Sequence, residues 1–162
     1  MPPHPRHPAQ MEPVLHIRPA ETSDADQISA LVQRTIRISN AKDYSAAVID
    51  RVVANFSPDA VQTLLSQRVV LVATQGAAVV GTASLDSDTV RTVFVDPKAQ
   101  GNGIGRQLMA AVEALARRNG TVLLQVPASL TAQSFYARLG YAGLRDAQHG
   151  DERTIIMAKQ IG

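Results

Sequence analysis

The hydrophobic positions of the chain alternate between the two-residue period of strands and the longer period of amphipathic helices. β-branched and alternating runs predict strands, which fall at residues 15–17, 69–73, 77–85, 89–95, 122–126, 141–145 and 154–158. Apolar stripes predict helices after a cap at Ser23 or Asp24, after Ser45 and after Ser57, and further helices over 104–118 and within 128–141. Pro19 ends the first strand, and Asn119-Gly120 ends the long central helix.

The order of these elements predicts a mixed sheet. The strand at 89–95 and the strand at 122–126 flank the helix over 104–118, so a right-handed crossover makes them parallel. The turn at Gln75-Gly76 joins its two strands as an antiparallel hairpin. We therefore expect an α/β fold with a mixed, mostly antiparallel twisted sheet of about seven strands and helices on both faces.

Length and composition indicate one domain preceded by a tail. The chain has 162 residues, of which 45% are hydrophobic, which is enough for one well-buried α/β domain. Residues 1–12 are expected to be a disordered tail and residues 13–162 a single domain, since Met1 to Gln10 holds four prolines and two histidines without an apolar run. Met11 is an alternative start. The two histidines are better explained as part of a disordered segment than as ligands of a metal ion, and no metal is expected.

Charge and cysteine usage exclude several classes of protein. The net charge is +2 and aromatic residues make up 4% of the chain, so neither a basic surface nor stacking residues indicate a nucleic-acid partner. The chain contains no cysteine, which excludes disulfides, thiolate zinc sites and a cysteine nucleophile. No apolar stretch is long enough to cross a membrane. We expect a cytoplasmic protein.

A glycine-rich loop between residues 93 and 106 carries most of the functional information. A β-branched run ends at Asp96-Pro97, and three glycines at alternate positions then open an amphipathic helix, an arrangement that binds anions such as phosphate. Walker A and the dinucleotide fingerprint both require glycine where Arg106 stands. The pattern that fits is Q/R-x-x-G-x-G/A, with Gln100, Gly103 and Gly105 at its defined positions.

This loop resembles the acetyl-CoA pyrophosphate loop of the GCN5-related N-acetyltransferase (GNAT) family. A second signature of that family, a helix with an aromatic-tyrosine pair that ends in glycine and an aromatic, is similar to residues 128–141. The first strand and helix cap over 15–26 also resemble the family, so the likeness covers nearly the whole chain after Met11. It implies that the two central parallel strands diverge into a V-shaped slot for the pantetheine arm.

The resemblance implies acetyl-CoA as the donor and assigns a set of residues to its binding. Lys98 and Arg106 are candidate charge partners for its phosphates. A backbone N–H near Phe94 or Val95 is expected to stabilise the oxyanion. The expected cofactor-binding residues are Phe94, Val95, Gln100, Gly101, Asn102, Gly103, Ile104, Gly105, Arg106 and Ser129. Many relatives have asparagine at the position of Ser129, and for this serine a helix-capping role is preferred over a contact with the coenzyme.

Tyr136 is the expected catalytic residue, carried over from the family as the general acid for the coenzyme thiolate. Phenol and thiol pKa values are about 10 and 8.5, so a close hydrogen bond matters more than complete proton transfer. The general base is not placed, because the glutamate of many relatives is replaced by Thr89. A water relay to Asp86, Asp88 or Asp43 is one route for the amine proton, and an acceptor amine of lower pKa is another. For each of these aspartates a turn or loop position is the preferred explanation, and for His149 it is an exposed hairpin loop.

The expected function is transfer of an acetyl group from acetyl-CoA to a primary amine by direct attack in a ternary complex, since no cysteine can carry the acetyl group. The acceptor is expected to be a small molecule or a peptide, selected by the segment from Thr35 to Phe56 on analogy with the family. A non-catalytic acyl-CoA-binding sensor on the same fold is the alternative. The sequence is compatible with a homodimer, and its charge, aromatic content and apolar stretches predict no nucleic-acid or membrane partner.

Overall fold

A twisted seven-stranded sheet forms the centre of the computed structural model, which describes residues 14–149 and 152–162. The expected tail over 1–12 lies outside these residues. The strand order is β1-β2-β3-β4-β5-β7-β6, and the strands are β1 (Leu15–Pro19), β2 (Val69–Gln75), β3 (Ala78–Asp86), β4 (Thr89–Val95), β5 (Leu123–Ser129), β6 (Ala142–His149) and β7 (Glu152–Gln160). Only β4 and β5 pair in parallel, so the sheet is mixed and mostly antiparallel, as predicted.

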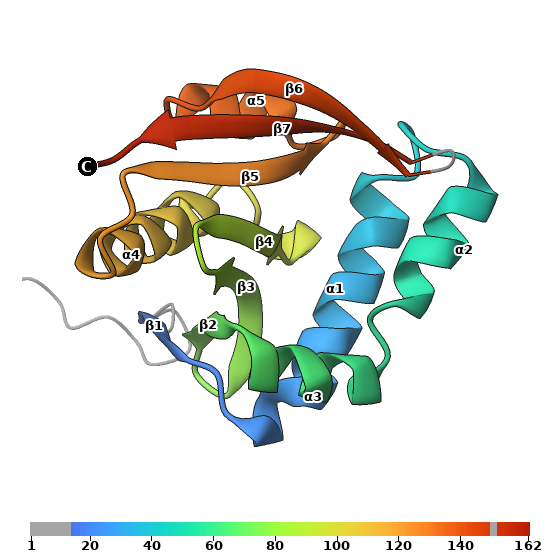
Figure 1. Cartoon of the computed structure of the whole chain (residues 1–162). Coiled ribbons are helices and arrows are strands. Elements are labelled where there is room, and N and C mark those ends of the chain that lie inside the picture. The colour runs from blue at the N-terminus through green and yellow to red at the C-terminus, as the bar shows by residue number, and fades with distance from the viewer. Residues whose placement is uncertain (1–13, 150–151) are drawn as a thin grey trace, which may run out of the picture.

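Helices cover both faces of this sheet (Figure 1). The helices are α1 (Ala25–Ser39), α2 (Ala46–Ala54), α3 (Pro58–Gln67), α4 (Ile104–Arg118) and α5 (Gln133–Arg138), with short 3-10 turns at Thr22–Asp24 and Pro97–Ala99. One hydrophobic core lies between the sheet and α4 and α5, and a second lies between the sheet and α1, α2 and α3. Within the described part of the chain, no helix combines the length and apolar character needed to cross a bilayer.

Serine caps begin α2 and α3 as predicted. The Ser45 hydroxyl accepts a hydrogen bond from the Val48 N–H at 3.2 Å, and the Ser57 hydroxyl accepts one from the Ala60 N–H at 3.2 Å. The start of α1 differs in detail. Asp24 occupies the N-cap position, but its carboxylate accepts bonds from the Arg18 guanidinium at 2.8 and 3.0 Å and from the Glu21 N–H at 2.7 Å. Asp24 therefore ties β1 to the turn before α1.

Replacing Asp24 with asparagine should lower the free energy of unfolding by about 1–3 kcal/mol at pH 7, because the lost hydrogen bonds involve a charged group. The Arg18 guanidinium, assisted by the Glu21 N–H, holds the pKa of Asp24 below its usual value against the effect of burial. A lowered folded-state pKa stabilises the protein above about pH 4, and this contribution disappears as the pH falls through the folded pKa. Urea unfolding at pH 7 and pH 3 measures both effects.

Asp146→Asn is the matched control for this charge change, because Asp146 is exposed on β6. Its stability should stay within about 0.5 kcal/mol of the parent protein at both pH values. Equal destabilisation by the two variants would contradict a specific role for Asp24.

The segment after β5 departs from the sequence prediction. Ala128 and Ser129 belong to β5, where they pair with Ile155 and Thr154 of β7, and α5 begins only at Gln133. Its N-cap is Ala132, which has no side-chain cap. The expected capping role of Ser129 is therefore wrong, because β7 draws this residue into the sheet and leaves a short turn before the helix.

The two central strands diverge along most of their length. Their ladder is confined to the pair Thr89–Gln125, supported by the bond from the Gln125 N–H to the Asp88 carbonyl at 3.0 Å. The register between β3 and β4 also shifts between Thr82 and Ser84, and Thr92 has a φ of 54°, a conformation that β-branched residues rarely adopt. This confirms the V-shaped opening that the family resemblance implies (Figure 1).

A buried carboxylate joins α4 to the last hairpin. Glu113 is 7% exposed and accepts bonds from the Tyr141 hydroxyl at 2.9 Å and from the Lys159 ammonium at 3.0 Å. Burial, followed by the charge of Glu113, raises the pKa of Tyr141. The Tyr141 hydroxyl is thus a structural hydrogen-bond donor.

Candidate active site

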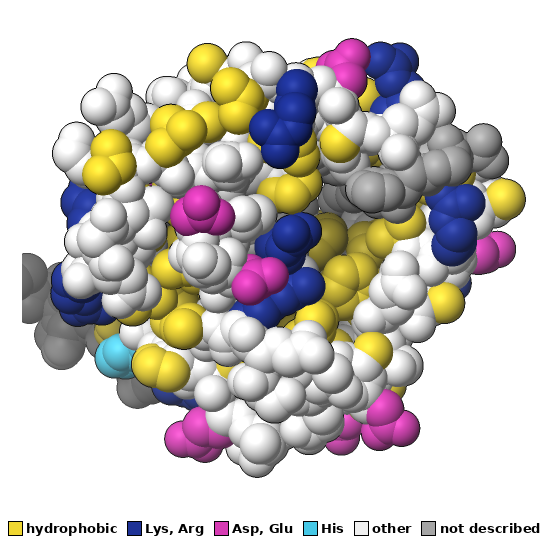
Figure 2. Space-filling model, in the orientation of Figure 1, with side chains coloured by type: hydrophobic (Ala, Val, Ile, Leu, Met, Phe, Trp, Pro, Cys, Tyr) yellow, Lys and Arg dark blue, Asp and Glu magenta, His cyan; other side chains and the backbone are white. Residues whose placement is uncertain are grey.

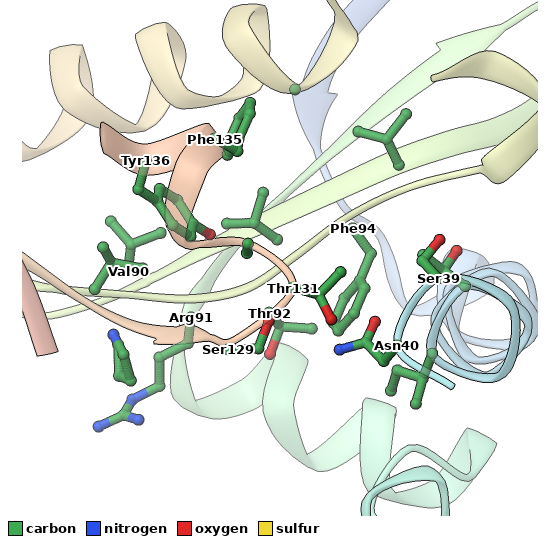
Figure 3. A pocket seen from close by; sticks show the side chains of 18 of the residues that line it. Ser39, Asn40, Val90, Arg91, Thr92, Phe94, Ser129, Thr131, Phe135 and Tyr136 are labelled. Atoms are coloured by element: carbon green, nitrogen blue, oxygen red, sulfur yellow. The ribbon is translucent and has the colours of Figure 1, made fainter. Parts of the chain in front are cut away.

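A cavity of about 910 Å³ opens where β4 and β5 diverge. It extends from the glycine loop at the start of α4, past α5, to the facing surfaces of α1 and α2. Figure 2 shows a hydrophobic hollow near the centre of one face of the molecule, with basic side chains beside it. In the close view of Figure 3, Thr92 and Phe94 come from β4, Ser39 and Asn40 from the end of α1, and Tyr136 from α5. One continuous space therefore contacts both halves of the sheet.

The glycine loop presents unpaired backbone donors at one end of this cavity. Gly103 lies at the N-cap of α4 with a φ of 77°, and Gly101 has a φ of 87°. Both values lie in the left-handed region, which glycine adopts without a steric cost. The first helical bond runs from the Gln107 N–H to the Gly103 carbonyl at 3.0 Å, so the three N–H groups from Ile104 to Arg106 precede it and have no helical acceptor. The helix dipole adds positive potential there.

Gly105 has a different role, because it brings the two sequence motifs together. A Cβ atom at this position would lie 3.1 and 3.2 Å from two ring atoms of Phe135 and 3.5 Å from Val95. A side chain at residue 105 would therefore require the Phe135 ring to shift by a few tenths of an ångström. The glycine loop and the helix that carries Tyr136 thus pack closely against each other.

Side chains on α1 and in the loop hold the loop in place. The Gln100 amide donates to the Val95 carbonyl at 3.1 Å and to the Ser39 hydroxyl at 3.4 Å. Asp96 accepts from the Lys98 N–H at 3.0 Å and forms an ion pair with Arg34 of α1. Burial by itself would raise the pKa of Asp96, but these two partners outweigh it and lower that pKa. The loop is therefore preorganised before any ligand binds.

The cavity contacts nearly all the residues that the sequence analysis assigned to the donor. Its lining includes Phe94, Val95, Gln100, Gly101, Gly103, Ile104, Gly105, Arg106 and Ser129. Asn102 and the candidate phosphate partner Lys98 are not part of the lining. Contact of these residues with a coenzyme stays a prediction.

Tyr136 lines the cavity from α5 and is 4% exposed. Its ring contacts the ring of Phe135, with centroids 5.1 Å apart, and the ring of Tyr141, with centroids 5.8 Å apart. Burial raises the pKa of the Tyr136 phenol, so this group stays protonated at neutral pH. A protonated phenol in an apolar wall can donate a hydrogen bond to an anion that forms in the cavity.

The edge of β4 that faces β5 supplies a further donor. The Asp96 N–H donates to the Val80 carbonyl at 2.8 Å, which directs it toward β3. Since the direction of backbone groups alternates along a strand, the N–H of Val95 points away from β3 and toward the gap. Of the two positions that the sequence analysis proposed for an oxyanion donor, this geometry favours Val95 over Phe94.

The charged side chains of the cavity lining, among the residues that the structure describes, are all arginines: Arg68, Arg91, Arg106 and Arg138. The three aspartates considered as base or relay lie outside the lining. Asp43 accepts from the Thr131 hydroxyl at 2.7 Å, Asp86 from Arg91 at 3.3 Å, and Asp88 from the Thr89 hydroxyl at 3.1 Å. Each of these aspartates, itself outside the cavity lining, thus accepts a hydrogen bond from a neighbouring side chain.

Arg68 and Arg91 line the cavity although neither was among the expected site residues. Arg68 follows α3 and Arg91 lies within β4, so 22 other residues separate them in the chain. A charged residue inside a β-branched strand, as in Thr89–Val95, was the available signal for Arg91. Nothing in the local sequence indicates that Arg68 reaches the same cavity.

The loop between α1 and α2 closes one side of the cavity. The Tyr44 hydroxyl donates to the Arg153 carbonyl at 2.8 Å and accepts from the Leu130 N–H at 2.8 Å. This loop therefore connects to the turn after β5 and to β7, across the cavity from α1. Several residues of the segment expected to select the acceptor line the cavity, namely Thr35, Ile36, Ser39, Asn40, Tyr44, Val48, Ile49, Val52 and Phe56.

Comparisons with known proteins agree with this arrangement. The family model described as Acetyltransferase (GNAT) domain matches residues 40–157, whereas no curated protein matches the chain significantly. The crystal structure of the GCN5-related N-acetyltransferase "Aminotransferase, Class-II" from Rhodopseudomonas palustris is 28% identical, with a TM-score of 0.85, over 96% of this chain and 99% of that chain.

Two more distant structures share the fold. The putative acetyltransferase yncA from Salmonella typhimurium, in a structure with its cofactor acetyl-CoA, is 24% identical with a TM-score of 0.64, over 91% of this chain and 94% of that chain. The paia N-acetyltransferase from Thermoplasma acidophilum, in complex with coenzyme A, is 16% identical with a TM-score of 0.78, over 91% of this chain and 99% of that chain. Within residues 14–149 and 152–162, no group of three potential metal ligands is present.

Proposed function

The chain belongs to the GNAT family of acetyltransferases, and on this basis we propose that it transfers an acetyl group from acetyl-CoA to the primary amine of an acceptor. The observation that carries the proposal is the continuity of one cavity from the glycine loop to the surfaces of α1 and α2. A donor bound at the loop and an acceptor bound beside α1 would share this space.

The glycine loop is the proposed site for the pyrophosphate of the donor. The free N–H groups at the start of α4 would bind its oxygens, and the side chain of Arg106 would add a positive charge. The gap between β4 and β5 would hold the pantetheine arm, because the unpaired strand edges there offer backbone donors and acceptors. The coenzyme-bound yncA and paia structures support this placement by their shared fold.

The proposed reaction is a direct attack in a ternary complex. The lone pair of the neutral acceptor amine forms a bond to the thioester carbon, and the carbonyl oxygen takes the negative charge opposite the Val95 N–H. The carbon–sulfur bond then breaks, and the Tyr136 hydroxyl donates a hydrogen bond or its proton to the departing thiolate. The amine releases its proton to water. No residue needs to carry the acetyl group, and the chain has no cysteine to do so.

Acetyl-CoA binding and thiol release test the proposal together. Acetyl-CoA at about 100 times its Kd should stabilise the protein by about 2.7 kcal/mol, which thermal unfolding detects as a raised Tm. Release of free coenzyme A thiol should then depend on added amine. Binding without amine-dependent turnover would instead support the non-catalytic acyl-CoA sensor, and the absence of binding would overturn both functions.

A further inference from the structure

The Arg91 side chain leaves the sheet on the face opposite α4, and Arg68 lies beside it. Val90 packs in the core formed with α4, whereas Phe94 packs against the core formed with α1, α2 and α3. Arg91 follows Val90 in β4, so its side chain leaves the strand on the α1 side. Arg68 donates to the hydroxyl of Thr92, the next residue of the same strand, at 3.2 Å. Both arginines line the cavity.

The positive charge of this pair is only partly compensated. Arg91 forms an ion pair with Asp86 at 3.3 Å, at a site where both side chains are more than 40% exposed. Arg68 forms no ion pair with any carboxylate in the described ranges, and its one hydrogen bond goes to a neutral hydroxyl. Burial, and then the neighbouring charge of Arg91, lower the pKa of Arg68. Two adjacent guanidiniums with one solvent-exposed partner form a site that favours an anion.

Apolar side chains of α2 line the same cavity as the arginine pair. Val48, Ile49 and Val52 of α2 line the cavity together with Phe56. The ring of Phe56 contacts the ring of Phe94 edge to face, with centroids 6.2 Å apart. The cavity therefore combines two cations with a hydrophobic surface, and among the described residues its lining contains no acidic side chain.

We infer that the acceptor is an amine that also bears a carboxylate, which binds between Arg68 and Arg91 while an apolar portion of the molecule packs against α2. This inference rests on the proposed acetyltransferase function. Paired guanidiniums bind a carboxylate through charge-assisted hydrogen bonds. A polyamine or an aminoglycoside, which carries several positive charges, would meet repulsion from the arginines, and the described residues of the cavity lining offer it no acidic partner.

The arginine pair also affects the proton balance of the reaction. Nearby positive charges disfavour the ammonium form of the acceptor and favour the neutral amine that attacks. The ammonium proton goes to water before the attack, and the proton that the nitrogen loses after the attack also goes to water, so this chemistry does not require a carboxylate base in the cavity lining.

Matched sets of amines test the inference. One set is leucine, leucinamide and 3-methylbutylamine, and a second, with a longer spacer, is 6-aminohexanoate, 6-aminohexanamide and hexylamine. We expect kcat/KM for the carboxylate member to exceed that for the amide by about tenfold or more in at least one set, since a charge-assisted contact is lost in the amide. Equal or better turnover of the uncharged members in both sets would overturn the inference and leave the proposed function intact.

Variants locate the effect. Arg68→Gln and Arg91→Gln should each reduce kcat/KM for the carboxylate amine about tenfold, mainly by raising its KM. For the same variants, kcat/KM for the uncharged amine and the KM for acetyl-CoA should each change by less than about twofold. Arg68→Lys and Arg91→Lys, which keep the charge, should recover part of the loss. Arg51→Gln removes the same charge from an exposed position of α2 outside the cavity lining. It should change neither kcat/KM for the two classes of amine nor the KM for acetyl-CoA. Losses of equal size on both classes of amine would contradict a carboxylate site.

A binding measurement decides the question if no amine is turned over, an outcome that would refute the proposed function. Calorimetric titration of the unmodified protein with N-acetylleucine and N-acetyl-6-aminohexanoate should then show saturable binding that Arg68→Gln weakens about tenfold. Thermal unfolding of the variant confirms that it is folded. The absence of binding for both carboxylates would overturn the arginine site as well.

Discussion

Replacing Gly103 with alanine should raise the Kd for acetyl-CoA by about tenfold to a hundredfold. Gly103 has a φ of 77° at the N-cap of α4, and an L-residue in this left-handed conformation costs about 1–2 kcal/mol. Relief of that strain would turn the loop and misdirect the backbone N–H groups that follow. The loss of one charge-assisted hydrogen bond, at about 1.5–3 kcal/mol, accounts for the expected change in Kd. Equilibrium titration with acetyl-CoA measures it.

Gly120→Ala provides a matched control at the other end of the same helix. Gly120 has a φ of 85°, and like Gly103 it has no heavy atom within 4 Å of an added Cβ. Both variants should therefore lose similar stability on urea unfolding, while only the change at Gly103 weakens acetyl-CoA binding. Similar Kd values for the two variants would show that the loop does not bind the donor through its backbone.

Tyr136→Phe should lower kcat about a hundredfold and leave the KM for acetyl-CoA nearly unchanged, since the hydroxyl acts only on the thiolate that forms during the reaction. The buried ring, which contacts Phe135 and Tyr141, is retained in phenylalanine, so the packing of α5 should persist. Steady-state thiol release at saturating acceptor measures kcat. Unchanged turnover would remove Tyr136 from the mechanism.

Tyr141→Phe separates catalysis from stability in the same aromatic cluster. The Tyr141 hydroxyl bonds to the buried Glu113 at 2.9 Å, so its removal should reduce the free energy of unfolding by about 1–3 kcal/mol. Tyr141 does not line the cavity, and kcat should stay within about twofold of the parent value. A kcat loss equal to that of Tyr136→Phe would indicate a general disturbance of α5 rather than a proton donor.

Local sequence signals predicted the elements of this fold well. The caps at Ser45 and Ser57, the stop at Asn119-Gly120 and the left-handed glycines of the loop all depend on residues close together in the chain. Because cap and turn geometry are decided by a few neighbouring residues, one sequence suffices to identify them. The capping role expected for Ser129 was wrong because pairing with β7, a strand distant in the sequence, outweighed the local preference of serine for a helix cap.

The sequence by itself determined the mixed sheet, the glycine loop and the place of Tyr136 on a helix after β5. These features depend on the spacing of hydrophobic residues and on the backbone freedom of glycine, which act over a few residues. Only the tertiary structure decided what surrounds them. The contact between Gly105 and Phe135, and the shared cavity of Arg68 and Arg91, arise when segments distant in the chain pack together. The divergence of β4 and β5 depends on their tertiary pairing, and no local pattern specifies it.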